Sequence, residues 1–563
     1  MARLTIRRRF VLVALPVAVL SAAAAARQGR AAGTVTVQLL AINDFHGNLN
    51  PPTGANGLIG RRAAGGAEYL ATHLKNAIAR NPNSIIVAAG DLIGASPLVS
   101  ALFHDEPTIE SLNAMNLAVT SVGNHEFDHG QAELRRMQKG GCHPSDGCQD
   151  GDGFVGARFE YLAANVVEQA GQKPAPFFPP TTIRTIAGVK IGFIGETLRN
   201  TPRIVSPTGV RGLTFLDEAT TANAYAAELK QQGVRAIVLL IHEGGVQSDN
   251  ADPNGCRGFS GAIARIAERL SPDIKVVISG HTHQFYNCTI AGHTVTSASS
   301  FGRMLTRIEV KLETADGTIT SVSAKNEIVD RSVPKDPRQT QLIARYAAVA
   351  APIANRVVGS VTGDIRRAAN RAGESPLGDI IADAQLAATS SADKGGAVVA
   401  FTNSGGIRAD LVANTRTGTE RPGQITYSEL FTVQPFSNVM TVQTLTGSMI
   451  KRLLEQQFGG LTVGTNRILQ VSGGFAYSYK LDAPPGQHVA PASIKIGDRI
   501  IGPDDRVRVA TNQFLAEGGD GFTVLREGTD QLGGDIDVDA LMAHFRTHSP
   551  VSPGVQNRII RLD

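Results

Sequence analysis

Residues 35–48 decide the fold: the apolar run VTVQLLAI is followed by Asn43-Asp44-Phe45-His46-Gly47-Asn48. The run is typical of a buried β-strand, and the turn after it carries a carboxylate and an imidazole two residues apart. Similar runs lie at 85–89, 189–194, 236–241 and 274–279, each bounded by polar or glycine-rich segments. Strands alternating with helical and loop segments predict a layered α/β domain in the N-terminal half.

Four later apolar runs, at 85–89, 119–122, 236–241 and 274–279, are also followed by acidic, amide or imidazole side chains. They lead into Gly90-Asp91-Leu92, Gly123-Asn124-His125-Glu126-Phe127-Asp128, His242-Glu243-Gly244 and Gly280-His281-Thr282-His283. Any one of these loops is compatible with an ordinary turn or a helix cap. Side chains delivered from several strand ends, however, converge on one edge of a sheet. Five such loops in succession therefore favour one shared site.

The donor types in these loops indicate metal ions. Carboxylate, imidazole and amide oxygen without thiolate suit borderline divalent ions such as Zn²⁺, Mn²⁺, Co²⁺ or Fe²⁺. Two ions about 3.5–4 Å apart need a bridging group, and Asp91, alone in its loop, is the expected bridge. Asp44 and His46, two apart on an extended segment, can direct both side chains to one point. His281 and His283 have the same spacing and could each serve a different ion.

Together these motifs resemble those of calcineurin-like metallophosphoesterases. In particular they resemble the exported bacterial 5′-nucleotidase family, which includes UDP-sugar hydrolases and is similar to animal ecto-5′-nucleotidases. The resemblance covers nearly all of residues 35–563. It implies an α/β fold with a four-layer α/β/β/α catalytic sandwich (33–329), a linker helix (330–357) and a C-terminal α+β substrate-binding domain (358–563).

The resemblance also implies two ligand sets. One ion would be held by Asp44, His46, Asp91 and His283, and the other by Asp91, Asn124, His242 and His281. His283 stands where some relatives carry glutamine, and an imidazole there binds a softer ion at least as well. A bridging water that loses its proton near neutral pH would then attack phosphorus in line.

His125 adjoins Asn124 but is not among the expected ligands. Asp128, three residues later, could hydrogen-bond its imidazole and favour the charged form. An imidazolium beside the phosphate would stabilise its oxygens or protonate the leaving alkoxide. In the family this pair is the catalytic dyad, and the alternative is that His125 only supports the ligands.

The C-terminal half offers arginines and aromatic residues instead of acid and histidine clusters. Strands are expected at 397–402, 439–445 and 507–511, after an alanine-rich helix at 339–357. The segment from Phe401 to Arg408 reads as a strand, a glycine-rich turn and a guanidinium that can bind phosphate. Arg367 and Arg371 would share a face if their segment were helical, although a solvated basic face is the better explanation of these two residues taken alone.

By resemblance, two segments (434–438 and 512–522) form a nucleoside pocket. Phe436 and Phe514 would stack on the base, and Asp520 would bind the ribose hydroxyls. Stacking contributes about 1–3 kcal/mol per base and is tolerant of base identity; ordinary core packing is the alternative for the two rings. The full expected substrate-binding set is Arg367, Arg371, Asn403, Arg408, Phe436, Asn438, Phe514 and Asp520.

The N-terminus has the order of an export signal. Six arginines and no acid or lysine lie within residues 1–32, so the rest of the chain has a net charge of −2 although the whole has +4. Basic residues, an apolar run at 10–20 and small residues at 22–26 are typical of a cleaved signal peptide, and Arg7-Arg8 allows a twin-arginine signal. An uncleaved anchor is the alternative, and no later segment resembles a transmembrane span.

The four cysteines agree with an oxidising compartment. Cys142 and Cys148 lie in a short polar insertion that favours a disulfide-closed loop, and Cys256 and Cys288 could form a second bridge. Three pairings are possible, and a zinc knuckle at Cys142 and Cys148 is the competing interpretation.

We therefore expect an exported two-metal enzyme that cleaves nucleoside 5′-phosphates to nucleoside and phosphate. Its partner would be a small nucleotide, because the mildly acidic body gives no reason to bind a nucleic acid polymer. The alternatives are a 2′,3′-cyclic phosphodiesterase with 3′-nucleotidase activity, a UDP-sugar diphosphatase, a sulfur-ester hydrolase of related fold, and a nucleotide-binding surface protein without turnover. The oligomeric state is left open.

Overall fold

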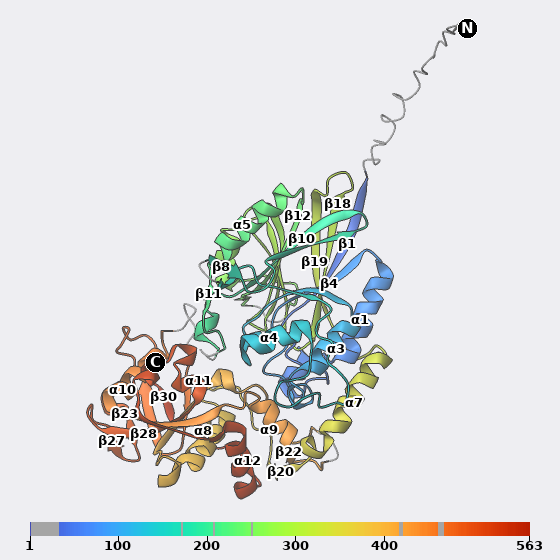
Figure 1. Ribbon diagram of the computed structural model, residues 1–563. Coiled ribbons are helices and arrows are strands. Elements are labelled where there is room, and N and C mark those ends of the chain that lie inside the picture. The colour runs from blue at the N-terminus through green and yellow to red at the C-terminus, as the bar shows by residue number, and fades with distance from the viewer. Residues whose placement is uncertain (2–32, 171–172, 206–208, 249–251, 416–419, 460–466) are drawn as a thin grey trace.

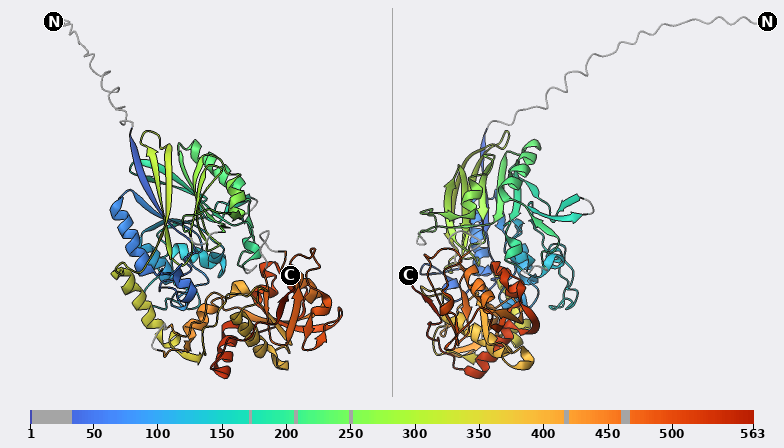
Figure 2. Two further views of the ribbon diagram at one scale, coloured as in Figure 1. Left: turned by 180° about the vertical axis from the view of Figure 1, so that it is seen from behind. Right: turned by 90° about the vertical axis from the view of Figure 1, so that its left-hand side faces the viewer.

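The polypeptide forms two α/β units joined by one long helix (Figure 1). The computed structural model describes residue 1 and residues 33–170, 173–205, 209–248, 252–415, 420–459 and 467–563. The yellow helix α7 (Pro337–Ala354) runs along one side of the molecule between the units. Views from behind and from the side show the same two units (Figure 2). This α/β architecture in two parts is the one predicted from the sequence.

Two mixed six-stranded sheets form the first unit. The order in one is β19-β18-β1-β4-β5-β6, and in the other β16-β17-β15-β12-β10-β9. The strands of the first are β1 (Thr34–Ile42), β4 (Ser84–Ala89), β5 (Leu117–Ser121), β6 (Glu160–Leu162), β18 (Met304–Glu313) and β19 (Ile319–Ile328). Those of the second are β9 (Thr181–Ile186), β10 (Val189–Thr197), β12 (Ala236–His242), β15 (Ile274–Ser279), β16 (Phe285–Ile290) and β17 (His293–Ala298).

The two sheets pack face to face, and helices cover their outer faces. In β1 the side chains alternate: Leu39 lies in the core between the sheets, whereas Leu40 packs under the helices. The same alternation places Leu240 between the sheets and Leu239 under the helices of the second sheet. The covering helices are α1 (Ala67–Arg80), α3 (Glu106–Ala114) and α4 (Gly130–Lys139) on one side, and α5 (Glu218–Gln231) and α6 (Ala262–Ala267) on the other. The result is a four-layer α/β/β/α sandwich.

The central strands of both sheets are parallel and deliver the active loops. β1, β4 and β5 are parallel neighbours in the first sheet, as are β12 and β15 in the second. Their carboxyl ends therefore lie at one edge of the sandwich, where the loops after them can meet.

The linking helix α7 begins at a strong cap. The Asp336 carboxylate accepts the backbone N–H groups of Arg338 (3.0 Å) and Gln339 (3.2 Å), and Pro337 occupies the first turn. This explains why the helix starts two residues before the expected 339, since proline is well tolerated at that position. It ends at Ala354, three residues before the expected 357.

The C-terminal unit contains a five-stranded, a four-stranded and a two-stranded sheet. The five-stranded sheet has the order β24-β21-β28-β23-β29. The four-stranded sheet has the order β27-β26-β25-β30, with β26 at Lys495–Ile496, β27 at Arg499–Ile500 and β30 at Ile559–Arg561. Its main strands and helices are β21 (Val399–Asn403), β23 (Val439–Thr446), β24 (Leu469–Val471), β25 (Phe475–Tyr479), β28 (Arg506–Asn512), β29 (Thr529–Ile536), α8 (Pro376–Thr389), α9 (Tyr427–Val433), α10 (Gly447–Gln456) and α12 (Asp537–His548). The three strands expected from the sequence coincide with β21, β23 and β28 to within two residues.

Two disulfides close loops of the first unit. Cys142 pairs with Cys148 and Cys256 with Cys288, across Cα–Cα distances of 4.8 and 5.2 Å. The expected bridges are thus confirmed, and a zinc knuckle at Cys142 is excluded because both thiols are consumed. Among the described residues no helix has the length and apolarity needed to cross a bilayer. The predicted signal peptide falls on residues that lie outside the described part of the chain, apart from Met1.

Candidate active site

The loops after the parallel strands bring the seven expected ligands together. In each of two clusters the ligating atoms lie within 4.8 Å of one another. The first contains Asp44, His46 and His283, and the second contains Asp91, His242 and His281. Asn124 joins the second cluster, because its Oδ1 lies 3.0 Å from Nδ1 of His281.

Asp91 lies between the two clusters. Its Oδ2 is 3.0 Å from Nε2 of His242 in one cluster and 3.6 Å from Nε2 of His46 in the other. Across the first cluster, Nε2 of His283 is 3.3 Å from Oδ1 of Asp44 and 3.1 Å from Nε2 of His46. One buried carboxylate therefore faces both sets of imidazoles.

Backbone carbonyls set the orientation of two buried imidazoles. Nδ1 of His46 lies 2.8 Å from the carbonyl of Gly94, and Nδ1 of His242 lies 2.7 Å from that of Ala89. A carbonyl can only accept, so Nδ1 carries the proton in both rings and the lone pair is on Nε2. Both Nε2 atoms point into the clusters, as metal-binding histidines require.

The polar atoms of the clusters fit a pair of cations. Nε2 of His242 is buried beside the Asp91 carboxylate but makes no well-aligned hydrogen bond among the described residues, and Nε2 of His46 faces another imidazole nitrogen. Buried polar atoms normally have a partner, so converging lone pairs need a cation between them. Imidazole, carboxylate and amide oxygen without thiolate match a borderline divalent ion.

Strained backbone accompanies these ligands. Five of the seven have left-handed φ angles, which are uncommon for residues other than glycine; they are Asp44 (49°), His46 (46°), Asp91 (49°), His281 (71°) and His283 (56°). Gly123 has to be glycine for a related reason, since a Cβ there would lie 2.2 Å from Oδ1 of Asp91. Such strain persists where the surrounding structure imposes it, and it gathers at functional sites.

Glu126 holds two of the ligand loops together, a role that the sequence analysis missed. Its buried carboxylate accepts the backbone N–H groups of Asp91 (2.9 Å), Leu92 (2.7 Å) and Gly123 (2.6 Å). The first two belong to the loop after β4 and the third to the loop after β5. Its position within the Gly123–Asp128 motif was the only sequence signal for this role.

His125 and Asp128 form the expected pair. Nδ1 of His125 lies 2.8 Å from Oδ2 of Asp128, and its backbone N–H donates to Oδ1 of Asp91 at 2.9 Å. Burial lowers the pKa of His125, but the carboxylates of Asp128 and Asp91 outweigh this effect and raise it above its ordinary value. The imidazole therefore favours the charged form at the mouth of the metal clusters.

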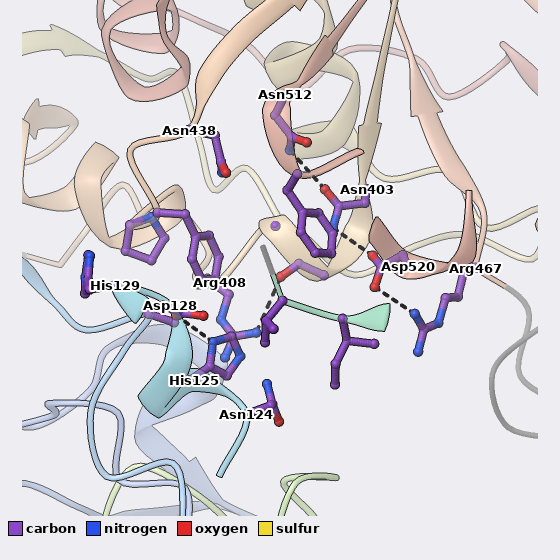
Figure 3. A pocket seen from close by; sticks show the side chains of 18 of the residues that line it. Asn124, His125, Asp128, His129, Asn403, Arg408, Asn438, Arg467, Asn512 and Asp520 are labelled. Carbon is purple, nitrogen blue, oxygen red and sulfur yellow. Dashed lines mark hydrogen bonds and ion pairs between the residues drawn. The ribbon is translucent and has the colours of Figure 1, made fainter. Parts of the chain in front are cut away.

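A cavity of about 220 Å³ extends from these residues into the C-terminal unit (Figure 3). The first unit contributes Asn124, His125, Asp128 and His281 to its wall. The C-terminal unit contributes Asn403, Arg408, Phe436, Asn438, Arg467, Asn512, Phe514 and Asp520. The cavity therefore connects the ligand cluster that contains His281 and Asn124 to the predicted nucleoside pocket.

A chain of hydrogen bonds orders the far wall of the cavity (Figure 3). The Asn403 amide donates to Oδ2 of Asp520 at 2.8 Å and accepts from the Asn512 amide at 3.2 Å. Arg467 donates to Oδ1 of Asp520 at 2.7 Å. Arg467 was not singled out from the sequence, because its role depends on a contact with Asp520, 53 residues away. Asn512 was expected only as the first residue of the pocket segment 512–522.

Arg408 lies where both units meet. Its guanidinium is 5.8 Å from the centre of the Phe436 ring, and that ring stacks on His125 with centres 5.7 Å apart. Nη2 of Arg408 is buried without a hydrogen-bond partner among the described residues. Burial and the neighbouring charge of Arg367 lower the pKa of Arg408, so this group is poised to accept an anion.

Two of the expected substrate residues lie outside the cavity, and a third lines it but is hydrogen-bonded to another residue. Arg367 and Arg371 are exposed and do not line the cavity; Arg367 donates to Asn56 Oδ1 (3.2 Å) and Arg371 to the Asp563 carbonyl (2.7 Å). Their segment is not helical, so the condition for a shared helical face is not met; α8 begins only at Pro376, after the Ser375 cap. Asn438 lines the cavity, but its amide donates to Asp537 at 3.1 Å.

Comparisons with known proteins match both units. Residues 37–285 match the family described as calcineurin-like phosphoesterase, and residues 357–527 match the one described as 5′-nucleotidase, C-terminal domain. The two matches cover most of the first unit and much of the second.

Curated relatives match over nearly the whole chain. The cell wall protein Lmo0130 of Listeria monocytogenes is 33% identical over 92% of this chain and 68% of its own length. The endonuclease YhcR of Bacillus subtilis is 31% identical over 93% of this chain, but this chain spans only 41% of that protein. Among solved structures, the 5′-nucleotidase precursor of Thermus thermophilus is 25% identical, with a TM-score of 0.76 over 94% of this chain and all of its own.

Proposed function

The chain belongs to the 5′-nucleotidase family of calcineurin-like phosphoesterases and is a metal-dependent phosphoester hydrolase, and from that premise we propose that it releases phosphate from nucleoside 5′-phosphates. One observation carries the proposal: a single cavity is lined by His125 and His281 at one end and by Phe514 and Asp520 at the other. A phosphate at the first end and a nucleoside at the second describe a nucleotide.

We assign the seven buried and half-buried ligands to two divalent ions. Asp44, His46 and His283 would hold one ion, Asn124, His242 and His281 the other, and Asp91 would contact both. When bound, the ions would supply an activated water and neutralise charge on the phosphate oxygens. Zn²⁺, Mn²⁺, Co²⁺ and Fe²⁺ all suit this donor set.

The chain's own groups would complete the reaction. His125, kept protonated by Asp128, would donate a proton or hydrogen bond to the oxygen that leaves with the nucleoside. Arg408, whose Nη2 is buried and unpartnered within the described structure, would bind phosphate oxygens as a charge-assisted donor. These two groups lie on opposite units, so catalysis would require both units to face the substrate.

The far wall of the cavity would bind the nucleoside. Phe436 and Phe514 would stack on the base, which supports a loose preference among bases. The Asp520 carboxylate, oriented by Asn403 and Arg467, would accept hydrogen bonds from the ribose hydroxyls.

We further propose that residues 33–329 form the catalytic domain and residues 358–563 the substrate-binding domain. The linker helix within 330–357 would join them, and the two domains would rotate relative to each other during turnover.

Export is part of the proposal. Two disulfides and the signal-like residues 1–32 support an oxidising location outside the cytoplasm. The proposal leaves the final location in the envelope or medium open.

A substrate panel tests the function. Purified protein would be stripped with a chelator and assayed for phosphate release from AMP, UMP, ATP, UDP-glucose, 3′-AMP and 2′,3′-cyclic AMP with several divalent ions. We expect AMP and UMP to lead, no release without metal, and recovery on adding it. A panel led by a cyclic or 3′-phosphate would refute the 5′ assignment, and AMP binding without release in any metal would refute hydrolysis.

Asp91→Ala tests the assignment of the bridging ligand in the same assay. Loss of the Asp91 carboxylate should remove most activity and lower the number of ions bound per chain, because this carboxylate lies beside both clusters. Asp152→Ala changes an exposed carboxylate that lies after the disulfide-closed loop; it serves as the control and should leave turnover unchanged.

A further inference from the structure

A short segment of the first unit reaches across to Arg408 of the C-terminal unit. It is the single turn η1 (Gly54–Gly57), on the loop that follows β1 and carries the proposed ligands Asp44 and His46. The Asn56 side chain on this turn bonds to two residues of the C-terminal unit, which lie 311 and 352 residues further along the chain. The mechanism proposed above does not use Asn56.

The Asn56 amide uses both of its polar atoms across the interface. Its Nδ2 donates to the backbone carbonyl of Arg408 at 3.0 Å, and its Oδ1 accepts from Nη2 of Arg367 at 3.2 Å. Arg367 also donates from Nη1 to the carbonyl of Ile407 at 3.3 Å and from its backbone N–H to Asp410 at 2.9 Å. Asn56 is therefore bonded directly to Arg408 and, through Arg367, to residues on either side of it.

The backbone of Arg408 is held from both units. Its N–H donates to the carbonyl of Val433 at 2.8 Å within its own unit, whereas its carbonyl accepts from Asn56 of the first unit. The guanidinium lies over the Phe436 ring, which stacks on His125 at the metal end of the cavity (Figure 3). A shift of this backbone would move the guanidinium relative to a bound phosphate, because the backbone carries the side chain.

The turn η1 is fixed on both sides. Nη2 of Arg331 donates to the carbonyl of Pro52 at 3.1 Å, which ties the loop to the segment before α7. Gly54 has a φ angle of 57°, and a Cβ there would lie 3.1 Å from Cγ2 of Val412 in the C-terminal unit. Glycine thus allows the turn to lie directly against the segment that follows the phosphate-binding arginine.

We propose that Asn56 is a positioning residue that sets the Arg408 guanidinium opposite the metal clusters. The inference rests on the phosphate-binding role proposed for Arg408. One loop carries His46 at one end and holds Arg408 at the other, so the two groups that would contact the phosphate keep a fixed separation. An amide suits this position, because one of its atoms faces a carbonyl acceptor and the other a guanidinium donor.

A double-mutant cycle on the full, metal-loaded chain tests the inference. kcat/KM for AMP would be measured for Asn56→Ala, for Arg408→Ala and for the double variant. Asn56→Ala should lower kcat/KM by about 10-fold on its own, because it removes both interface hydrogen bonds. In the Arg408→Ala background the same change should cost no more than about 2-fold, since no guanidinium is left to position. Asn56→Asp should be as impaired as Asn56→Ala, because a carboxylate cannot donate to the Arg408 carbonyl.

Asn223→Ala is the matched control. The Asn223 amide also donates to an arginine carbonyl (Arg269, 2.9 Å) and accepts a backbone N–H (Ser271, 2.6 Å), but all of these groups belong to the first unit. This variant should keep the wild-type kcat/KM. Urea unfolding of every variant shows whether a loss of activity accompanies a loss of stability.

The outcomes separate the positioning role from the proposed function. Equal fold-losses from Asn56→Ala in both backgrounds would indicate a merely structural role and overturn the inference, as would wild-type turnover in Asn56→Asp. Wild-type kcat/KM in Arg408→Ala would instead refute the phosphate assignment itself. The affinity of the metal-loaded proteins for inorganic phosphate, measured by calorimetry, gives the same cycle without turnover, so it tests the positioning role even if AMP is not cleaved.

Discussion

Replacing Glu126 tests how the metal ligands are held in place. Its two carboxylate oxygens accept three buried backbone N–H groups from the loops after β4 and β5. In Glu126→Gln the amide oxygen can take the place of Oε2 and keep the bonds from Asp91 and Gly123. The amide nitrogen then faces the N–H of Leu92, and two donors cannot bond.

The magnitude follows from the number of stranded donors. A buried N–H without an acceptor costs about 1–3 kcal/mol, so Glu126→Gln should lower the free energy of unfolding by that amount. Glu126→Ala strands three donors and should cost about 3 kcal/mol or more. Because the Asp91 loop loses its anchor, the apparent metal affinity should fall by about 10–100-fold.

The assay is phosphate release from AMP in metal-buffered solutions, with urea unfolding of the same proteins. We expect a higher metal concentration at half-maximal rate and a smaller change in the rate at saturating metal. Glu196→Gln is the control: its carboxyl is fully buried with no hydrogen-bond partner in the described structure, and burial raises its pKa well above the ordinary value. Because an uncharged carboxylic acid and an amide are nearly isosteric, Glu196→Gln should change the required metal concentration little. If Glu126→Gln and Glu196→Gln required the same metal concentration, the anchoring role would be refuted.

Three further predictions concern the substrate. His125→Gln should lower kcat for AMP by about 10²–10⁴-fold while the number of bound ions stays the same, and a loss of metal instead would show that the residue only supports the ligands. Phe514→Ala should lower kcat/KM for AMP by an amount equivalent to about 1–3 kcal/mol, because the base loses its stacking partner. It should leave kcat/KM for ribose 5-phosphate, which lacks a base, unchanged, and equal losses on both substrates would contradict stacking. Arg408→Ala should cost about 2 kcal/mol or more in kcat/KM, whereas Arg371→Ala should be near wild type, since only the first lines the cavity; the reverse order would disprove the phosphate assignment.

Local pattern was sufficient to predict the strands and the linking helix. β1 and β12 are apolar on both faces because each is packed between a second sheet and a helix layer, so their near-continuous hydrophobic runs were readable. The loops after them were readable for a similar reason: a carboxylate or imidazole directly after a buried strand has few ordinary explanations. The loops were therefore predictable as one shared site, and the family resemblance supplied the choice of seven ligands within them.

Local pattern failed where a neighbour distant in sequence decides the outcome. Arg367 and Arg371 were expected to bind substrate, but in the structure Arg367 donates to Asn56 and Arg371 to Asp563, which lie 311 and 192 residues away. Glu126 and Arg467 were missed because their partners, Asp91 and Asp520, lie 35 and 53 residues away. Spacing carries no information about contacts of that kind.

The sequence by itself determined which chemistry is available: the donor types, their order along the chain and the strands that carry them, since these follow from side-chain identity and from the two-residue period of a β-strand. Only the tertiary structure shows how closely the donors approach one another, that the Asp91 carboxylate lies beside imidazoles of both clusters, and which of the three possible cysteine pairings is formed. Those outcomes depend on how two sheets and an insertion pack against one another, and packing is a property of the whole chain.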